Sequence, residues 1–415
     1  MTAKNEQAPH TPSRTAHPHA GLDLDLLGPD GEGSRSLARS LRAFGESTML
    51  PAAAYTSAEV FAWEQRHLFA GTWTCVGRVS DLSGDRSGAP VRQQAIVVGD
   101  VPVLLTFTDA GVRAFANTCR HRGHELLAAE GSATQQSIVC PYHGWNYRLD
   151  GSLRVAPEFR EAPGFRPEEY HLVALPIEEW HGWLFVHAER SLDEGPPVSF
   201  TEHVGALDTV LAPYSPADLA LGARHTYAVN ANWKVLTENY HECYHCPLIH
   251  PELCRVTPPT SGENYDLPGA WVGGSMDLRD GMATMSVTGE SAGRPIPGVD
   301  PTRVEYVGLF PNLLVSAHPD YVMAHRLVPL SPDRTWVECS WYFPPSDPPV
   351  DPAYAVEFWD LTNQQDWSAC ESVQRGLASP HFRPGPLAPS EDAVHQFVAM
   401  VGRGYLGEPV GGPGL

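Results

Sequence analysis

The stretches CRHRG (residues 119–123) and CPYHGW (residues 140–145) decide how this chain is interpreted. Each begins with a cysteine, places a histidine two or three residues later, and has a glycine shortly after the histidine. Thiolate sulfur and imidazole nitrogen both bind transition metals well. Because glycine allows a tight turn of the backbone, the two stretches predict a pair of matched ligand loops.

Cys119, His121, Cys140 and His143 match the ligand set of a Rieske two-iron two-sulfur cluster. In such a cluster two cysteines hold one iron and two histidines hold the other, and the cluster passes single electrons. A four-coordinate zinc site also uses two cysteines and two histidines. Zinc sites usually group Cys with Cys and His with His, so the spacing favours the cluster.

The composition is that of a globular protein that binds neither nucleic acid nor a membrane. The chain has 415 residues, 42% of them hydrophobic, and a formal net charge of −21. This length predicts two or three domains, and the acidic excess disfavours polyanionic partners. We see no apolar run of transmembrane length and no apolar signal sequence. The eight scattered cysteines do not form a disulfide-rich pattern, so we expect a cytoplasmic protein.

Residue patterns divide the chain into four parts. Residues 1–45 are rich in Pro, Gly, Ser, Thr and charge, and we expect a disordered tail. Residues 46–71 should form an N-terminal helical part of the catalytic domain. Residues 72–187 alternate short apolar strands with Gly and Asp turns, which predicts a small all-β domain with the cluster ligands in its loops. Residues 188–415 predict a larger catalytic domain with an antiparallel sheet and helices, so the expected fold class is α+β.

The individual elements follow from apolar periodicity and from capping residues. The expected helices are 57–64, 232–246 and 353–378, and the expected strands are 94–98, 101–107, 112–115, 147–149, 152–155, 183–187, 227–229, 304–309, 313–318, 321–328 and 336–343. Residues 255–302 are rich in Pro and Gly and lack periodicity. We expect a mobile loop there that covers the functional site.

The first helix of the larger domain carries a second set of candidate ligands, in ENYHECYHCPLIHP (residues 238–251). The carboxylates of this motif and His245 would share one helical face. Pro247 would end the helix and allow His250 to fold back beside His245. Two such imidazoles plus one carboxylate from elsewhere would form a facial triad. That triad suits ferrous iron and leaves positions open for dioxygen and substrate.

Three alternatives remain open for this motif. His241 and His245, four residues apart, could be the metal pair instead. Cys243 and Cys246 could bind zinc together with His250. The segment could also be a polar helix face without a metal. A Rieske cluster upstream favours iron, because a one-electron donor has little use for zinc.

From residue 50 to about residue 377 the chain resembles the large (α) subunit of the Rieske non-heme iron oxygenases. The resemblance rests on the paired cluster motif, on NWK (residues 232–234) running into the second motif, and on Gln365-Asp366 in the last expected helix. It implies that the cluster is held by Cys119, His121, Cys140 and His143, that a mononuclear ferrous iron is held by His245, His250 and Asp366, and that cluster and iron are bridged by Glu242.

Asp366 is the ligand that spacing alone leaves undecided. Asp360 and Glu371 lie on the same expected helix, and helical spacing does not choose among the three carboxylates. The position of Asp366 in the family pattern, just before ESVQRG (residues 371–376), favours it.

Within this family, ECYHC (residues 242–246) is similar to the branch that acts on quaternary ammonium compounds: choline, glycine betaine and carnitine monooxygenases and stachydrine demethylase. The resemblance implies a homotrimeric terminal oxygenase. Electrons from NAD(P)H would arrive through a separate reductase or ferredoxin, and O2 would be used to hydroxylate or N-demethylate a small molecule.

Other functions stay open at this point. The substrate could be an aromatic or polycyclic small molecule, the chain could be a Rieske electron-transfer protein with an inactive second site, or the metal could be structural zinc. A quaternary ammonium substrate favours an aromatic cage. The candidates for such a cage, by location only, are Tyr265, Trp271, Phe310 and Tyr321.

Overall fold

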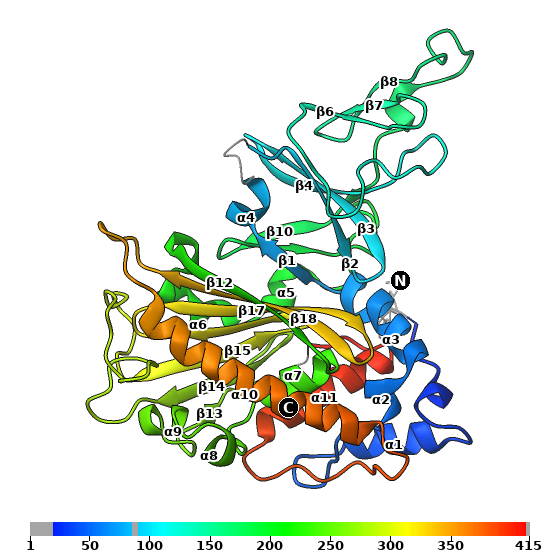
Figure 1. Ribbon diagram of the computed structural model, residues 1–415. Helices are drawn as coiled ribbons and strands as arrows, with labels where there is room; N and C mark the ends of the chain where they lie inside the picture. Colours follow the sequence, from blue (N-terminus) through cyan, green and yellow to red (C-terminus); the bar gives the residue numbers. More distant parts are fainter. Residues whose placement is uncertain (1–19, 85–89, 412–415) are drawn as a thin grey trace, which may run out of the picture.

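A β-rich domain, residues 74–186, rises from a broader domain of helices and strands (Figure 1). The computed structural model of the chain describes residues 20–84 and 90–411. The architecture is α+β, as the sequence predicts. Within the described residues, no helix is both long and apolar enough to cross a membrane.

The small domain is built from three antiparallel sheets. Their strand orders are β5-β2-β3-β4-β9, β1-β11-β10 and β6-β7-β8. Its strands are β1 Thr74–Arg78, β2 Gln93–Val98, β3 Val101–Thr108, β4 Gly111–Ala116, β5 Ser132–Ala133, β6 Ser137–Val139, β7 Asn146–Arg148, β8 Leu153–Val155, β9 Ala174–Leu175, β10 Ile177–Trp180 and β11 Trp183–Val186.

The tight hairpins of this domain follow from short turn sequences. Val98 pairs with Val101 across a two-residue turn, in which Gly99 has a φ of +59°. Such turns require positive φ, which glycine adopts at little cost. The expected strands at these hairpins are confirmed. The second cluster loop, residues 140–145, lies between β6 and β7 at the outer end of the domain (Figure 1).

The larger domain is organised around one seven-stranded antiparallel sheet with the order β12-β18-β17-β16-β15-β14-β13. The strands are β12 Ala220–Val229, β13 Glu263–Asn264, β14 Trp271–Asp277, β15 Arg303–Leu309, β16 Leu313–Ala317, β17 Val322–Ser331 and β18 Arg334–Phe343. The helices that accompany it include α5 Phe200–Val204, α6 Leu207–Leu211, α7 Trp233–Tyr240, α8 Cys246–Ile249, α9 Leu253–Val256, α10 Ala353–Leu377 and α11 Asp392–Tyr405.

The two faces of this sheet differ in chemistry. Side chains alternate along a strand, so Val307 and Val315 point to one face and Tyr306 and Ser316 to the other. The first face is apolar and packs against α5, α6 and the base of the small domain. The long helix α10 lies across the second face (Figure 1). This second face is mixed, because a hydrophobic cluster that includes Trp341 and Phe358 lies beside the buried polar side chains of Ser316, His318 and His325.

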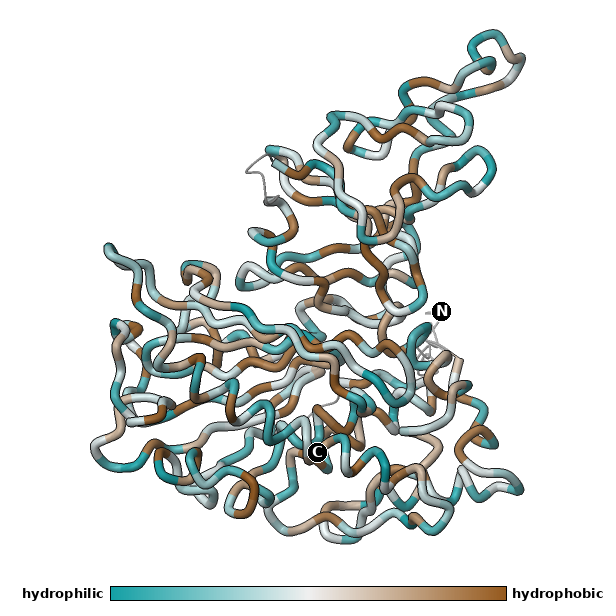
Figure 2. The backbone as a smooth tube through the Cα atoms, in the orientation of Figure 1, coloured by the Kyte–Doolittle hydropathy of each residue, from teal (hydrophilic) through white to brown (hydrophobic). Residues whose placement is uncertain are grey.

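The two domains are joined by apolar packing and by several hydrogen bonds, among them one reciprocal pair and the bonds from Arg78 to the Pro216 carbonyl. Trp73, Trp183 and Phe185 of the small domain belong to the same buried cluster as the apolar face of the sheet. Asn312 accepts a hydrogen bond from the Cys75 amide at 2.9 Å and donates one to the Cys75 carbonyl at 2.9 Å. Apolar segments are concentrated at this junction, whereas the outer loops of the small domain are more hydrophilic (Figure 2).

The N-terminal region differs from the expectation of a disordered tail over residues 1–45. Residues 1–19 lie outside the described part of the chain, but residues 32–40 form helix α1, Glu32–Ser40. Leu37 is 1% exposed and packs in the core that also contains α11. The prediction is therefore wrong from residue 20 onward, because a few leucines in a polar segment are buried against α11.

Two further expectations need correction. The helix expected over 232–246 ends at Tyr240, and a turn separates α7 from α8. The loop expected over 255–302 contains β14, an interior strand of the main sheet. Gly273 and Gly274 in β14 lie so close to neighbouring backbone that an added Cβ would meet carbonyl oxygens at 2.1 and 1.9 Å. Close strand contact explains these glycines, which in the sequence look like loop residues.

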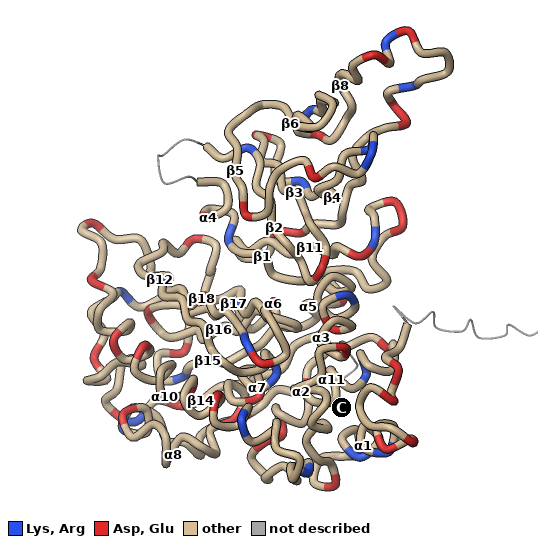
Figure 3. The backbone as a smooth tube through the Cα atoms, turned by 45° about the vertical axis from the view of Figure 1, so that its right-hand side comes forward, with Lys and Arg blue, Asp and Glu red and all other residues tan. Residues whose placement is uncertain are grey.

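Lys and Arg positions are interspersed with Asp and Glu positions along the chain in both domains (Figure 3). One ion pair is fully buried. Lys234 Nζ lies 2.6 Å from Glu64 Oε1, and both side chains are 0% exposed. Glu64 also accepts hydrogen bonds from the Trp233 indole and from the Tyr405 hydroxyl. This network ties α7 to α3, Ala58–Glu64, and to α11.

We expect Lys234→Met to lower the free energy of unfolding by about 3–5 kcal/mol, because it leaves the Glu64 carboxylate buried without a counter-charge. The double variant Glu64→Gln/Lys234→Met should be much more stable than the single variant, because no isolated charge remains. Urea unfolding followed by circular dichroism measures both. Equal destabilisation in the two variants would contradict this role of the pair.

Candidate functional site

The two cysteine–histidine loops of the small domain have the same backbone pattern. The Cys119 amide donates to the His124 carbonyl, and the Gly123 amide donates to the Cys119 carbonyl. In the second loop the Cys140 amide donates to the Trp145 carbonyl, and the Gly144 amide donates to the Cys140 carbonyl. Gly123 and Gly144 have φ values of +74° and +71°. Both loops therefore need glycine at the corresponding turn position.

The four predicted cluster residues come together at the ends of these loops. Cys119 and Cys140 are each 2% exposed, and the rings of His121 and His143 lie 4.7 Å apart. Burial raises the pKa of the Cys119 thiol, since the charged form is poorly solvated. Two buried sulfurs beside two outer imidazoles fit the asymmetric ligand set of a Rieske cluster.

Neighbouring aromatic residues hold the loops. Trp145 is buried and stacks on His121 with ring centroids 5.1 Å apart and an interplanar angle of 4°. The Tyr147 hydroxyl lies 3.3 Å from Cys119 Sγ and accepts the Arg120 amide at 3.1 Å. Partners of this kind fix the orientation of metal ligands.

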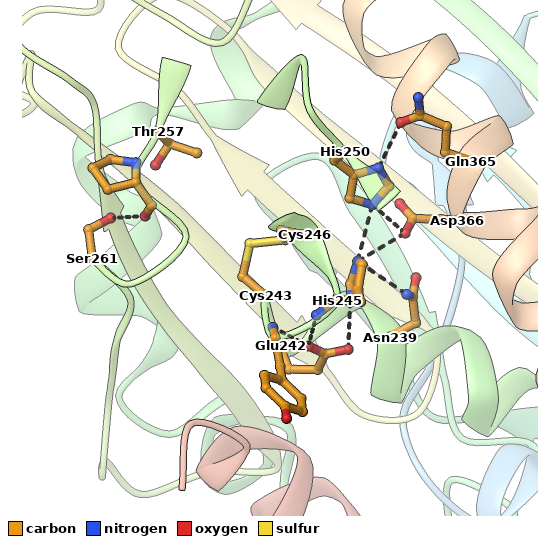
Figure 4. The surroundings of a disulfide bond; sticks show 12 residues. Asn239, Glu242, Cys243, His245, Cys246, His250, Thr257, Ser261, Gln365 and Asp366 are labelled. Carbon is orange, nitrogen blue, oxygen red and sulfur yellow. Dashed lines mark hydrogen bonds and ion pairs between the residues drawn. A yellow bond between two sulfur atoms is a disulfide. The ribbon is translucent and has the colours of Figure 1, made fainter. Parts of the chain in front are cut away.

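His245, His250 and Asp366 meet in the larger domain (Figure 4). One donor atom from each lies within 4.8 Å of the others. His250 Nε2 is 2.9 Å from Asp366 Oδ1, and His245 Nε2 is 3.1 Å from His250 Nε2. The three ligating atoms converge on one point, which suits a two-histidine, one-carboxylate metal site.

Each of these histidines uses its other ring nitrogen for a protein partner. His245 Nδ1 lies 2.5 Å from Glu242 Oε1, and His250 Nδ1 lies 2.7 Å from Gln365 Oε1. Such contacts fix the tautomer and the ring orientation and leave both Nε2 atoms free for a metal. Gln365, adjacent to Asp366 on α10, is a site residue whose role the sequence did not reveal.

The electrostatics of the triad favour a cation. Burial lowers the pKa of His245, but the hydrogen bonds and charges of Asp366 and Glu242 outweigh it and raise the pKa to about 9. Burial raises the pKa of Asp366, but the two histidines outweigh it and lower the pKa overall. The site therefore stabilises positive charge between these side chains.

The turn between α7 and α8 replaces the continuous helix that the sequence predicts. Glu242 accepts hydrogen bonds from the backbone amides of Tyr244 and His245, which competes with helix formation. Consequently the motif carboxylates and His245 do not share one helical face. Glu238 is buried and instead accepts a hydrogen bond from the Tyr55 hydroxyl at 2.7 Å.

The alternative ligand sets for this motif are not formed. His241 is 6% exposed, and no other described metal-binding side chain joins it in a ligand group. Cys243 and Cys246 form a disulfide (Figure 4), so they do not supply a pair of thiolates for zinc. The pairing was not expected from the sequence.

The competing carboxylates of α10 are engaged elsewhere. Asp360 accepts a hydrogen bond from the Tyr227 hydroxyl at 2.7 Å and contacts His225 Nδ1 at 3.1 Å. Glu371 accepts from the backbone and side-chain amides of Asn230 at 3.0 and 2.9 Å. Only Asp366 of the three lies beside the histidine pair.

The four candidates for an aromatic cage do not gather around this site. Phe310 packs in the core between Trp233 and the C-terminal helix α11. Trp271 and Tyr265 lie together on the apolar face of the sheet. Tyr321 alone lies on the face covered by α10.

Both domains of the chain match known protein families. Residues 72–166 match the Rieske [2Fe-2S] domain, and residues 216–407 match the catalytic domain of the ring hydroxylating alpha subunit. The oxygenase subunit of carnitine monooxygenase from Acinetobacter baumannii is 30% identical over 343 residues, which cover 80% of this chain and 86% of that protein. The chain belongs to the Rieske non-heme iron oxygenase family.

Two further relatives support the same family assignment. The oxygenase subunit of glycine betaine monooxygenase from Chromohalobacter salexigens is 30% identical over 389 residues, or 84% of each chain. A solved quaternary ammonium Rieske monooxygenase, described for carnitine oxidation and inter-subunit electron transfer, superposes with a TM-score of 0.68 and 25% identity. It covers 89% of this chain and 97% of that one. This Rieske oxygenase is therefore an oxidoreductase. It has a Rieske [2Fe-2S] domain and the catalytic domain of a ring hydroxylating alpha subunit.

We expect Asp366→Ala to lose about one of roughly three irons per chain and to keep the brown colour of the cluster, because the two metal sites use separate ligands. Asp360→Ala is the matched control on the same helix and should keep all of its iron. Metal analysis and visible absorption measure both. Iron loss in Asp360→Ala with full iron in Asp366→Ala would show that the third ligand is misassigned.

Proposed function

We propose that this Rieske oxygenase is the terminal component of a cytoplasmic homotrimer that mono-oxygenates a quaternary ammonium compound or a related amine. The product would be a hydroxylated compound or, if the oxidised carbon is bonded to nitrogen, an N-demethylated amine. Electrons would come from NAD(P)H through a separate reductase or ferredoxin.

One observation carries this proposal. The same chain holds a Rieske-type ligand set and a converging triad of His245, His250 and Asp366, and Glu242 contacts the first of these histidines. The relatives at 30% identity that are named for carnitine and glycine betaine support the substrate class. The acidic charge of the chain is compatible with a cationic substrate.

The residues divide the chemistry in a simple way. When bound, the cluster supplies single electrons and ferrous iron offers open positions for dioxygen. His245, His250 and Asp366 would hold the iron from one side. Glu242 and Gln365 keep the imidazoles oriented through their Nδ1 atoms. Asp366 Oδ1 lies close to both imidazoles, so the two histidines help to hold its carboxylate in place.

The separation of the two sites supports a trimer. The second cluster loop lies at the outer end of the small domain, whereas α8 lies at the far side of the larger domain (Figure 1). Electrons that pass through Glu242 would then come from a neighbouring chain. Tyr244 and Leu248, beside Glu242, are 67% and 89% exposed, and Tyr142 in the cluster loop is 53% exposed. In the proposed trimer these exposed side chains would contact a neighbouring chain.

The substrate class is tested by coupled turnover. Purified protein with a reductase, NADH and dioxygen should consume oxygen in proportion to product formed from carnitine, glycine betaine or choline. His245→Ala should retain the cluster and lose turnover. If only aromatic compounds gave coupled product, the alternative of an aromatic hydroxylase would replace this proposal.

Glu242→Gln tests the path between the two metal sites. We expect both metals to be retained and turnover to fall by about tenfold or more, because the amide holds the His245 ring less firmly than the carboxylate does. Stopped-flow reoxidation of the reduced cluster, with substrate and dioxygen present, measures the step directly. Reoxidation at the wild-type rate would eliminate a bridging role for Glu242.

A further inference from the structure

His318 is a buried histidine that the proposed chemistry does not use. It follows β16, is 0% exposed, and neither ring nitrogen has a hydrogen-bond partner among the described residues. Burial keeps the imidazole neutral by lowering its pKa well below the usual range. Buried polar groups without partners are uncommon, and each calls for a water, an ion or a ligand.

The neighbours of His318 cannot supply the missing partners. Tyr321 stacks on the imidazole with ring centroids 4.1 Å apart. The Tyr321 hydroxyl already donates to the Met285 carbonyl and accepts from the Trp359 indole, both at 2.7 Å. The ring of Trp359 lies 5.5 Å from His318, and that of Tyr306 lies 6.3 Å away. The imidazole is therefore packed among aromatic rings, and the Tyr321 hydroxyl and the Trp359 indole are already engaged in hydrogen bonds with other groups.

A continuous strip of side chains connects His318 with the iron triad. Trp359 and Asp366 are seven residues apart on α10, so they lie on the same side of the helix and about 10 Å apart along its axis. Between them, Asn363 accepts from His325 Nε2 at 3.1 Å. The Tyr240 ring lies 6.1 Å from His325 and 6.2 Å from Tyr306.

Several unpartnered buried polar atoms lie along this strip. From the sheet and from α10 they are both nitrogens of His318, His325 Nδ1, Trp341 Nε1 and Trp367 Nε1, and His241 Nε2 joins them from the end of α7. The described chain has further such atoms elsewhere, among them both nitrogens of His187. The opposite face of the same sheet is apolar. A polar ligand beside α10 would satisfy such atoms.

The end of the strip near His318 is closed by the chain. Asp320 is 1% exposed and accepts hydrogen bonds from Thr284 and Tyr354, both at 2.6 Å, and from Ser291. The Ile296 amide donates to the Pro319 carbonyl at 2.7 Å. The segment 284–296 is thus fastened over the turn that carries His318 and closes this end of the strip from solvent.

We propose that His318 donates a hydrogen bond to a carboxylate oxygen at the end of the substrate that is remote from the iron. A charged acceptor makes the strongest bond to a buried N–H group. The substrate would be a compact cation whose acid group lies several bonds from the carbon that is oxidised. This inference rests on the proposed function and specifies its substrate.

A matched pair of ligands tests the proposal. γ-Butyrobetaine and n-butyltrimethylammonium have the same cation and chain length, but only the first carries a carboxylate. Calorimetric titration of the protein with both iron sites loaded, without reductant or dioxygen, should show tighter binding of γ-butyrobetaine by about tenfold or more.

Substitutions of His318 distinguish a hydrogen bond to the substrate from a role of the ring in packing alone. His318→Phe keeps a ring against Tyr321 and should reduce the preference for the acid to about twofold or less, because no donor remains. His318→Gln retains a donor and should keep part of the preference. His187→Phe removes an equally buried histidine at the end of β11, 1% exposed, and should leave the preference unchanged. Cluster absorbance and iron content confirm folding, and His318→Met replaces His318→Phe if the latter does not fold.

The outcomes distinguish this inference from the function on which it rests. If wild-type protein binds neither ligand, the quaternary ammonium substrate class and the role of His318 both fail. If wild-type protein binds both without preference, or if His318→Phe or its substitute His318→Met keeps the wild-type preference, only the role of His318 is overturned. In that case the imidazole is satisfied by buried water and serves packing alone.

Discussion

The buried ion pair between Lys234 and Glu64 is the interaction on which the active site depends. Removing two charges from water is costly, and the cost is offset only when each charge meets partners at close range. Glu64 meets Lys234, the Trp233 indole and the Tyr405 hydroxyl, and this geometry allows only one placement of α7. Helix α7 leads into the turn that contains Glu242 and His245. The ion pair therefore also positions the first of the iron ligands, His245.

The parts of the site that the sequence predicted are those that short-range chemistry specifies. The cysteine, histidine and glycine of each cluster loop lie within five residues, so their spacing alone describes the loop. The break after Tyr240 could not be read in the same way. Helical periodicity continues past it, but the Glu242 carboxylate bonds to two nearby backbone amides and makes the turn the better structure.

Long-range contacts explain the remaining differences. Asp360 and Asp366 are alike in the sequence, and only the placement of α10 gives one to Tyr227 and the other to the histidines. Gly273 and Gly274 look like loop residues, yet they allow β14 to approach its neighbouring strands. Leu37 of α1 gains its partners from α11, far along the chain. These outcomes depend on which helices and strands pack against one another in the folded protein. A single sequence does not reveal such tertiary contacts.

Helix α10 carries both a metal-binding residue and a residue that bonds beside His318, so the positions of these two groups are coupled. It supplies the metal-binding Asp366 and the adjacent Gln365 near its middle, and Tyr354, which bonds to Asp320, in its first turn. A helix is stiff along its axis, so the distance between these groups is nearly constant. A shift of α10 would move Asp366 and the partner of His250 together and preserve their arrangement. Substrates of different length must then be accommodated by replacing side chains along the helix, because neither Asp366 nor Tyr354 can move alone.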